Sequence, residues 1–129
     1  MKKVIGIGGI FFKAKDPEGL RQWYGKHLGI ESEGESGASF HWREVDNPEQ
    51  QCLTVWSPFP HDTKYFEPSA APFMINYRVA DLDSLLAQLR AEGVEVDPRV
   101  EEYDYGRFAW VMDPEGNRIE LWEPPASDK

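Results

Sequence analysis

Glu120 and Tyr105 are the two residues of this sequence whose types and surroundings could do chemistry. Glu120 lies between Arg118 and Trp122 in an alternating, strand-like segment. A carboxylate whose pKa is raised by an apolar cavity and lowered by a nearby arginine could serve as a general base. Tyr105 could donate a hydrogen bond to a ligand oxygen. The simpler alternatives are a Glu120 that only pairs with an arginine and a Tyr105 that only ends a strand.

The segment that holds Glu120 has an earlier counterpart in the chain. Residues 108–122 match residues 42–56 at a constant offset of 66, and residues 75–81 match residues 10–16 at an offset of 65. Self-similarity at a fixed offset indicates repeated structural units. The sequence therefore predicts two copies of one small unit, in which equivalent positions can be compared.

Each copy is predicted to contain a strand, a helix and further strands. Apolar residues at helical spacing, with the caps Asp16 and Asp81, predict two helices that end at Gly29 and Gly93. Alternation of apolar and polar residues predicts the strands. These are residues 5–14, 39–45, 52–56, 74–79, 94–96, 108–112 and 118–122.

Strand alternation assigns the side chains to two faces of the predicted sheet. Leu53, Val55, Ile119 and Leu121 are expected to face the helices. The opposite face gathers aromatic, amide and arginine side chains, which favour a ligand cavity over the alternative of plain core or a dimer interface. The predicted ligand-binding residues are Phe11, Trp42, Trp56, Asn76, Arg78, Phe108, Trp110, Arg118 and Trp122.

The composition limits the partners and the compartment of the protein. The 129 residues carry a formal net charge of −9, which argues against nucleic-acid binding and fits a neutral or cationic ligand. No run approaches the roughly 20 apolar residues of a membrane helix. Residues 4–12 resemble a short signal peptide, but three glycines interrupt them and no cleavage site follows. With Cys52 as the single cysteine, we expect a cytoplasmic protein without a disulfide.

Residues 113–122 resemble the terminal hairpin of the vicinal oxygen chelate superfamily, which includes glyoxalase I, extradiol dioxygenases and bleomycin-resistance proteins. Residues 10–30 resemble its opening strand and helix. The resemblance implies an α+β fold of two tandem βαβββ modules whose curved mixed sheet forms a cup, commonly in a homodimer. We expect a single glyoxalase-like domain over residues 1–129. Its modules would span about 4–57 and 73–125, joined by a linker of about 58–72.

Metal enzymes of this superfamily hold the ion at the base of the cup, with one residue from the first strand and one from the last strand of each module. The matching positions here are Gly9, Thr54, Met74 and Glu120. Only Glu120 is a plausible ligand, because glycine has no side chain and threonine and methionine suit such an ion poorly. We therefore expect no bound metal and no other cofactor. A rebuilt metal site would need the histidines of the chain, His27, His41 and His61.

Three functions remain open at this point. The first is a metal-free protein that sequesters an aromatic or cationic small molecule, as bleomycin-resistance proteins do, with Glu44 and Glu120 supplying charge. The second is a lyase, isomerase or dioxygenase that uses a rebuilt metal site, or Glu120 and Tyr105 alone. The third is a regulatory protein that uses the fold without ligand chemistry.

Overall fold

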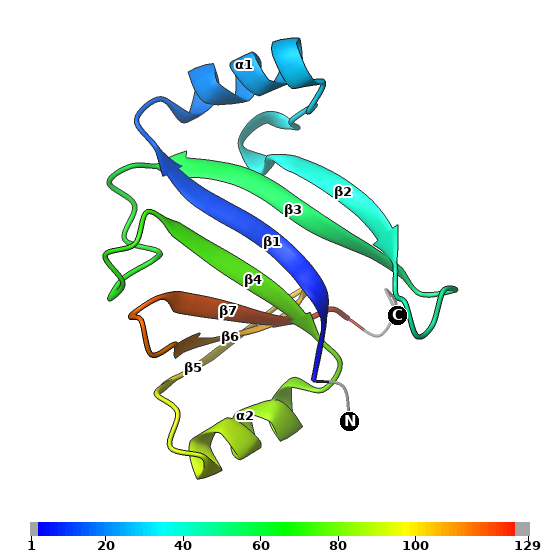
Figure 1. Cartoon of the computed structure of the whole chain (residues 1–129), viewed down its shortest axis with the longest axis vertical. Helices are drawn as coiled ribbons and strands as arrows, with labels where there is room; N and C mark the ends of the chain where they lie inside the picture. Colours follow the sequence, from blue (N-terminus) through cyan, green and yellow to red (C-terminus); the bar gives the residue numbers. More distant parts are fainter. Residues whose placement is uncertain (1–2, 126–129) are drawn as a thin grey trace.

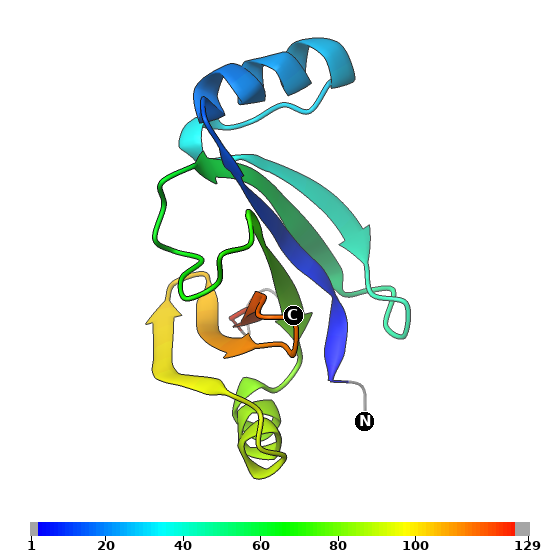
Figure 2. The same ribbon diagram turned by 60° about the vertical axis from the view of Figure 1, so that its left-hand side comes forward.

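Seven strands form one open mixed sheet with two helices on its outer face in residues 3–125, the part of the chain that the computed structural model describes (Figure 1). The strand order is β2-β3-β1-β4-β7-β6-β5. The sheet curves around a concave face on the side away from the helices (Figure 2). Within these residues, no helix has the length and apolar character needed to cross a membrane. The elements are β1 (Val4–Ala14), α1 (Pro17–Leu28), η1 (Gly34–Ser36), β2 (Ala38–Arg43), β3 (Gln51–Pro60), β4 (Phe73–Val79), α2 (Leu82–Ala91), β5 (Val96–Tyr103), β6 (Gly106–Met112) and β7 (Arg118–Glu123).

Both helices begin and end where the sequence predicts. The Asp16 side chain accepts a hydrogen bond of 3.0 Å from the backbone N–H of Gly19 in the first turn of α1. Asp81 does the same for Ser84 in α2, at 3.2 Å. Such side chains satisfy N–H groups that the first helical turn leaves unpaired. Gly29 ends α1 at a φ of 71°, in the left-handed region that glycine adopts without steric cost.

The pairing of the strands confirms the internal duplication. β1 and β4 run antiparallel at the centre of the sheet, with Gly9 opposite Asn76 and Phe11 opposite Met74. β3 lies parallel to β1 on one side, and β7 lies parallel to β4 on the other. The two halves are therefore related by an approximate twofold axis between β1 and β4. This arrangement confirms the α+β, glyoxalase-like fold, as an open sheet.

The first module contributes one strand fewer than the second. α2 is followed by three strands, β5, β6 and β7, whereas α1 is followed by only β2 and β3. Residues 29–37, which the structure describes, contain a short 3-10 helix where the complete βαβββ pattern would place a strand. The reason is compositional, since glutamate, serine and glycine dominate residues 31–37 and are poor strand formers.

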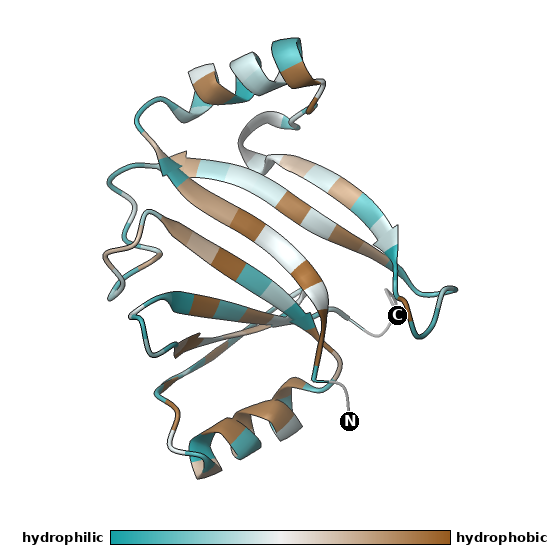
Figure 3. Cartoon of the chain, in the orientation of Figure 1, coloured by the Kyte–Doolittle hydropathy of each residue, from teal (hydrophilic) through white to brown (hydrophobic). Residues whose placement is uncertain are grey.

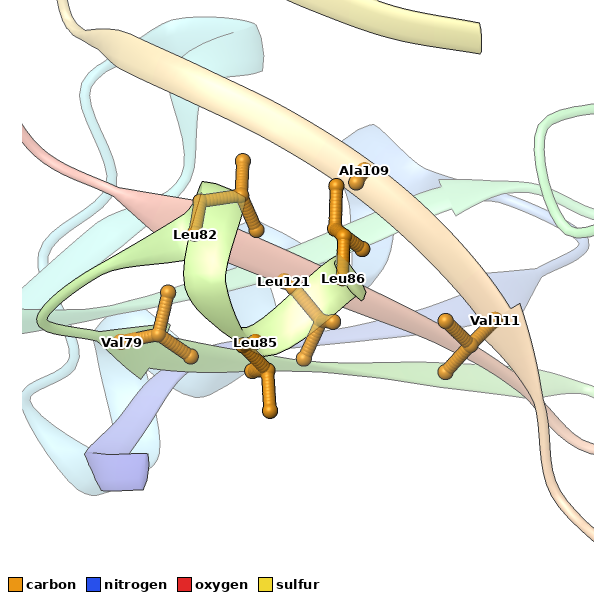
Figure 4. Close-up of a cluster of buried hydrophobic side chains, with 7 residues drawn as sticks. All are labelled: Val79, Leu82, Leu85, Leu86, Ala109, Val111 and Leu121. Carbon is orange, nitrogen blue, oxygen red and sulfur yellow. The ribbon is translucent and has the colours of Figure 1, made fainter. Parts of the chain in front are cut away.

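The main core lies between α2 and the sheet (Figure 4). Along β1 and β4, hydrophobic and more polar residues follow one another in short runs and not in strict alternation (Figure 3). A second buried cluster lies on the concave face and consists of Phe66, Met74, Phe108, Trp110 and Trp122. In contrast, α1 contains no buried residue. The main core between α2 and the sheet consists of Val79, Leu82, Leu85, Leu86, Ala109, Val111 and Leu121.

The predicted faces are correct for β7 and wrong for β3. Trp56 packs on Phe12 and on Tyr24 of α1, with ring centroids 5.4 and 4.9 Å apart, so it lies on the helix side. Leu53 and Val55, expected on the helix side, line the concave face instead. Because side chains alternate along a strand, an error of one residue in register moves every side chain to the other face.

The cause of this error is the offset of 66 between residues 42–56 and 108–122. That offset aligns the turn residues of the two hairpins, but it does not align β3 with β7. Across the sheet, Val55 pairs with Gly9, Gly9 with Asn76, and Asn76 with Glu120. The residue that lies in the same cross-strand row as Glu120 is therefore Val55, 65 residues before it, and not Thr54 as expected.

The hairpin of the first module also has a longer turn, which shifts the pairing of β2 with β3 relative to the pairing of β6 with β7. Seven residues, 44–50, join β2 to β3, whereas five, 113–117, join β6 to β7. Ser39 therefore pairs with Val55, where Trp110 pairs with Glu120 in the second module. Trp42, expected in the cavity, instead donates a hydrogen bond of 2.9 Å from its indole nitrogen to the Thr54 hydroxyl.

Candidate functional site

The concave face encloses a cleft of about 1150 Å³ that both modules line. Small-molecule sites typically occupy ~300–1,000 Å³ and combine apolar walls with a few polar groups. Seven of the eleven predicted site residues line the cleft, namely Phe11, Asn76, Arg78, Tyr105, Phe108, Glu120 and Trp122. Of the described residues, four predicted ones lie outside its lining, namely Trp42, Trp56, Trp110 and Arg118.

Glu120 lies on the floor of the cleft, with 2% of its surface exposed. Its Oε1 accepts a hydrogen bond of 2.7 Å from Asn76 Nδ2. Its Oε2 accepts one of 3.0 Å from the indole of Trp110 and another from the Tyr65 hydroxyl. Burial raises the pKa of Glu120, and the three hydrogen bonds, together with the charge of Arg118, oppose that rise. Both carboxylate oxygens are therefore engaged by the protein.

Tyr65 is the site residue that sequence reasoning missed. It comes from the segment between β3 and β4, which was expected only to join the modules, and its ring stacks on Phe59 with centroids 5.9 Å apart. Burial and the adjacent charge of Glu120 raise the pKa of the Tyr65 hydroxyl, which keeps it protonated. The available signal was the presence of three aromatic residues, Phe59, Tyr65 and Phe66, in a segment otherwise rich in proline and polar residues.

Trp110 and Arg118 support Glu120 from behind the cleft surface. Trp110 is 1% exposed, and its ring lies 5.1 Å from the guanidinium carbon of Arg118. Arg118 in turn forms an ion pair of 3.5 Å with Asp97. A backbone hydrogen bond from Arg99 is the main cause that lowers the pKa of Asp97, so this carboxylate is a stable partner. The two residues thus contribute to the position and charge of Glu120.

A stacked pair of rings forms the wall of the second module. Phe108 and Trp122 lie nearly parallel, at an interplanar angle of 6° with centroids 6.2 Å apart. The indole nitrogen of Trp122 donates a hydrogen bond of 2.8 Å to the carbonyl oxygen of Tyr105. Arg78 lies over the other side of this wall, with its guanidinium carbon 5.7 Å from the Trp122 ring. The wall is therefore fixed by contacts at both ends.

Tyr105 lies at the rim of the cleft and is 59% exposed. Its ring stacks on Tyr103 and meets the edge of Phe108, with centroids 5.2 and 5.6 Å apart. These contacts place the phenol beside the cleft but away from the buried carboxylate floor. A role for Tyr105 in contacting a ligand remains a proposal.

The residues at the base of the cup do not fit a metal ion. The cross-strand row of Glu120 holds Val55, Gly9 and Asn76, and the expected position Met74 adds only a thioether, so the site offers one carboxylate whose oxygens are already hydrogen-bonded. Divalent ions of the Zn²⁺ or Mg²⁺ type need several oxygen or nitrogen ligands. Among residues 3–125 there is no group of three or more His, Cys, Asp and Glu side chains that could hold an ion.

The three histidines are separated in the structure. His41 lines the cleft from β2, which is an edge strand of the sheet. His27 contacts Trp23 in the last turn of α1, with ring centroids 4.9 Å apart. His61 follows the end of β3. The rebuilt metal site considered from the sequence would need these residues to converge on Glu120.

Comparisons with known proteins agree with this fold. The sequence model of the Glyoxalase/Bleomycin resistance protein/Dioxygenase superfamily matches residues 6–121. A methylmalonyl-CoA epimerase from Mycobacterium tuberculosis has a similar structure, with a TM-score of 0.63 and 19% identity over 98% of this chain and 93% of that one. A variant of the Streptomyces coelicolor methylmalonyl-CoA epimerase in complex with 2-nitronate-propionyl-CoA gives 0.71 and 18%, over 98% and 99%. No curated protein sequence matches the chain.

Proposed function

Because this chain belongs to the Glyoxalase/Bleomycin resistance protein/Dioxygenase superfamily, we propose that its cleft binds a small molecule with a planar ring, without a metal ion at Glu120. The observation that carries this proposal is the state of Glu120, whose oxygens accept hydrogen bonds from Tyr65, Asn76 and Trp110. A buried carboxylate satisfied in this way holds the floor of the cleft together. Because the oxygens of Glu120 already bond to the protein, the aromatic walls of the cleft are the surfaces that would bind the ligand.

The rings that line the cleft suit a planar ligand. Phe108 and Trp122 form a parallel pair on one wall, and Phe11 and Phe59 lie together on another, with centroids 5.3 Å apart. An aromatic pair stabilises a complex by about 0.5–1.5 kcal/mol beyond the effect of area burial. Leu53 and Val55 add hydrocarbon surface from β3. These contacts favour ring-containing ligands over extended polar ones.

Titration with 2-naphthamide, a neutral bicyclic amide, tests this proposal through tryptophan fluorescence, since Trp122 borders the cleft. We expect saturable quenching with one ligand per chain, and no change when EDTA is added. Val55→Phe should weaken binding about tenfold, because the added ring fills part of the cleft. Ile10→Phe, a similar enlargement on the outer face of β1, should leave the dissociation constant unchanged. Unsaturable quenching, or equal binding by Val55→Phe, would refute the proposal.

A second candidate function is proton transfer by Tyr65 and Glu120. Tyr65 lines the cleft, and its hydroxyl donates to a carboxylate whose pKa is raised by burial, an arrangement suited to moving a proton. His41 lines the same cleft from β2 and could serve as a second acid or base. Several proteins of similar structure are methylmalonyl-CoA epimerases, and epimerisation of such a compound requires removal and return of a proton.

Solvent exchange separates the two functions. Methylmalonyl-CoA incubated with the protein in D₂O should exchange the proton next to the thioester carbonyl for deuterium, visible by NMR, if the second function holds. Glu120→Gln should then stop the exchange. If the rate equals that of a protein-free sample, the binding function stands alone.

A homodimer and a cytoplasmic location also remain proposals. The support for a dimer is the exposed apolar surface of the first module, where Trp23 and Leu28 of α1 are 50% and 62% exposed. The molar mass from light scattering during size-exclusion chromatography would decide this point. A monomer at micromolar concentration would rule out a stable dimer.

A further inference from the structure

Arg78 is a buried cation in the wall of the cleft. It comes from β4, directly beside Trp122 of β7, and only 3% of its surface is exposed. Its guanidinium lies over the Trp122 ring, and the residue lines the cleft. Lysine and arginine are almost never buried to this extent unless they are paired. The group that balances the charge of Arg78 therefore has to be identified.

Apart from the Trp122 ring, no hydrogen-bond or ion-pair partner for Arg78 is found in the described part of the chain. Its Nε is buried without a hydrogen-bond partner, and no described carboxylate forms an ion pair with it. Other arginines have an acidic partner: Arg107 pairs with Asp83 at 2.9 Å, and Arg99 and Arg118 share Asp97. Arg78 resembles Arg118 in its burial and in its unpaired Nε, and differs from it in its lack of a counter-charge.

The acidic groups that line the cleft have other partners or lie at its rim. Glu120 is engaged by three donors from the protein. Glu101 accepts from the Tyr103 hydroxyl and pairs with Arg99 at 3.9 Å. Glu49 is exposed on the hairpin between β2 and β3. The interior of the cleft beside Trp122 therefore carries a positive charge, although the whole chain is acidic.

We propose that Arg78 anchors a carboxylate group of the ligand, so that the ligand of the cleft is an aromatic or other planar carboxylate. This inference rests on the proposed binding function and specifies the class of ligand. A guanidinium binds a carboxylate through two parallel hydrogen bonds, and the ring attached to that carboxylate would lie along the Phe108–Trp122 wall. One cation matches one carboxylate, whereas a phosphate dianion would leave a negative charge buried. The neutral or cationic ligand expected from the net charge is replaced by an anionic one.

A pair of probes that differ in charge but hardly in shape tests this inference. Calorimetric titration of the wild-type protein with 2-naphthoate and 2-naphthamide should give at least about tenfold tighter binding of the carboxylate. Arg78→Met should abolish that preference while it binds the amide with nearly unchanged affinity. Arg78→Lys should keep part of the preference, because the charge remains and the two-pronged geometry is lost.

Arg107→Met is the matched control, since it makes the same change in net charge at a surface ion pair. It should keep the full preference for the carboxylate. Equal binding of the two probes to the wild-type protein would overturn the inference and leave the aromatic binding function intact. Binding of neither probe would refute the binding function, and the inference with it. If Arg78→Met still binds 2-naphthoate more tightly than 2-naphthamide, a group other than Arg78 binds the carboxylate.

Discussion

The hydroxyl of Tyr65 donates a hydrogen bond to Oε2 of Glu120, which links the segment between the modules to the last strand of the sheet. The same carboxylate accepts from Asn76 in β4 and Trp110 in β6. Four separate parts of the chain thus meet at one buried group. Satisfied buried networks of this kind hold their surroundings in one arrangement. We expect the shape of the cleft to depend on this network.

Tyr65→Phe tests the contribution of the hydroxyl. It should lower the free energy of unfolding by about 1–2 kcal/mol, since a buried carboxylate loses one of its donors. It should also raise the pKa of Glu120 further, because the Tyr65 hydrogen bond lowers it. Guanidinium unfolding measures the first effect. Tyr103→Phe is the control, because its hydroxyl bonds to Glu101 on an exposed part of β5, and it should cost less than about 0.5 kcal/mol. Equal losses in the two variants would contradict this prediction.

Glu120→Gln should change the pH dependence of stability. Burial raises the pKa of Glu120 in the folded protein, so its contribution to stability is largest below the pKa of the unfolded chain and falls as the pH rises through the folded value. Glutamine does not ionise. The free energy of unfolding of the variant relative to the wild type should therefore increase as the pH rises above about 4, the pKa of an ordinary glutamate. Urea unfolding across this range measures the difference.

Asp97→Asn should show the opposite trend and serves as the comparison. A hydrogen bond from the Arg99 backbone is the main cause of the lowered pKa of Asp97, so this carboxylate stabilises the fold above its unfolded pKa and loses that effect as the pH falls. The deficit of this variant should be present at neutral pH and shrink below about pH 4. Parallel curves for both variants would show that neither group is coupled to folding.

Trp110→Ala should destabilise the protein by about 3–5 kcal/mol, because the side chain fills the second core cluster and donates to Glu120. Trp23→Ala removes a half-exposed tryptophan from α1 and should cost less than about 1 kcal/mol. Thermal unfolding of the two variants provides the comparison. If Trp110→Ala unfolds at the wild-type temperature, this residue belongs to a mobile wall and not to the core.

Gly8→Ala should disturb the cleft more than the fold. A Cβ atom at Gly8 would clash with Oδ1 of Asn76 and lie 2.9 Å from the Trp122 ring, so the side chain that bonds to Glu120 has to shift. We expect weaker quenching by 2-naphthamide. Gly25→Ala, in the middle of α1, meets only the Ile30 carbonyl at 3.4 Å and should stabilise the protein by about 0.5–1 kcal/mol without changing binding. Normal quenching in Gly8→Ala would show that Asn76 adapts freely.

The helix and the last hairpin of the second module could be predicted from the sequence, because their signals are local, whereas β5 (Val96–Tyr103) was expected only as a short strand at residues 94–96. The cap Asp81 and the short turn of residues 113–117 set the helix and the hairpin register. Once that register is known, alternation places Glu120 and Trp122 on the concave face and Leu121 in the core. The faces of β6 and β7 follow without knowledge of the tertiary structure.

The first module and the connecting segment could not be predicted in the same way. The face on which Trp56 lies depends on whether β3 is aligned with β7 at an offset of 65 or of 66 residues. A difference of one residue moves Trp56 to the other face of the sheet. Tyr65 lies in an irregular segment, where no periodicity indicates direction. Its contact with Glu120 is set by the path of the chain across the concave face, which is a property of the folded molecule.

The approximate twofold axis between β1 and β4 relates positions of unlike chemistry. Val55 occupies in the first module the place that Glu120 occupies in the second, and Gly9 occupies that of Asn76. A molecule that spans the axis therefore meets hydrocarbon at one end and hydrogen-bonding groups at the other. An elongated guest with one apolar end and one polar end therefore has one preferred direction along the sheet, because turning it round would place hydrocarbon against Glu120 and Asn76. The duplicated architecture, symmetric in its backbone, is thereby equipped to orient its guest.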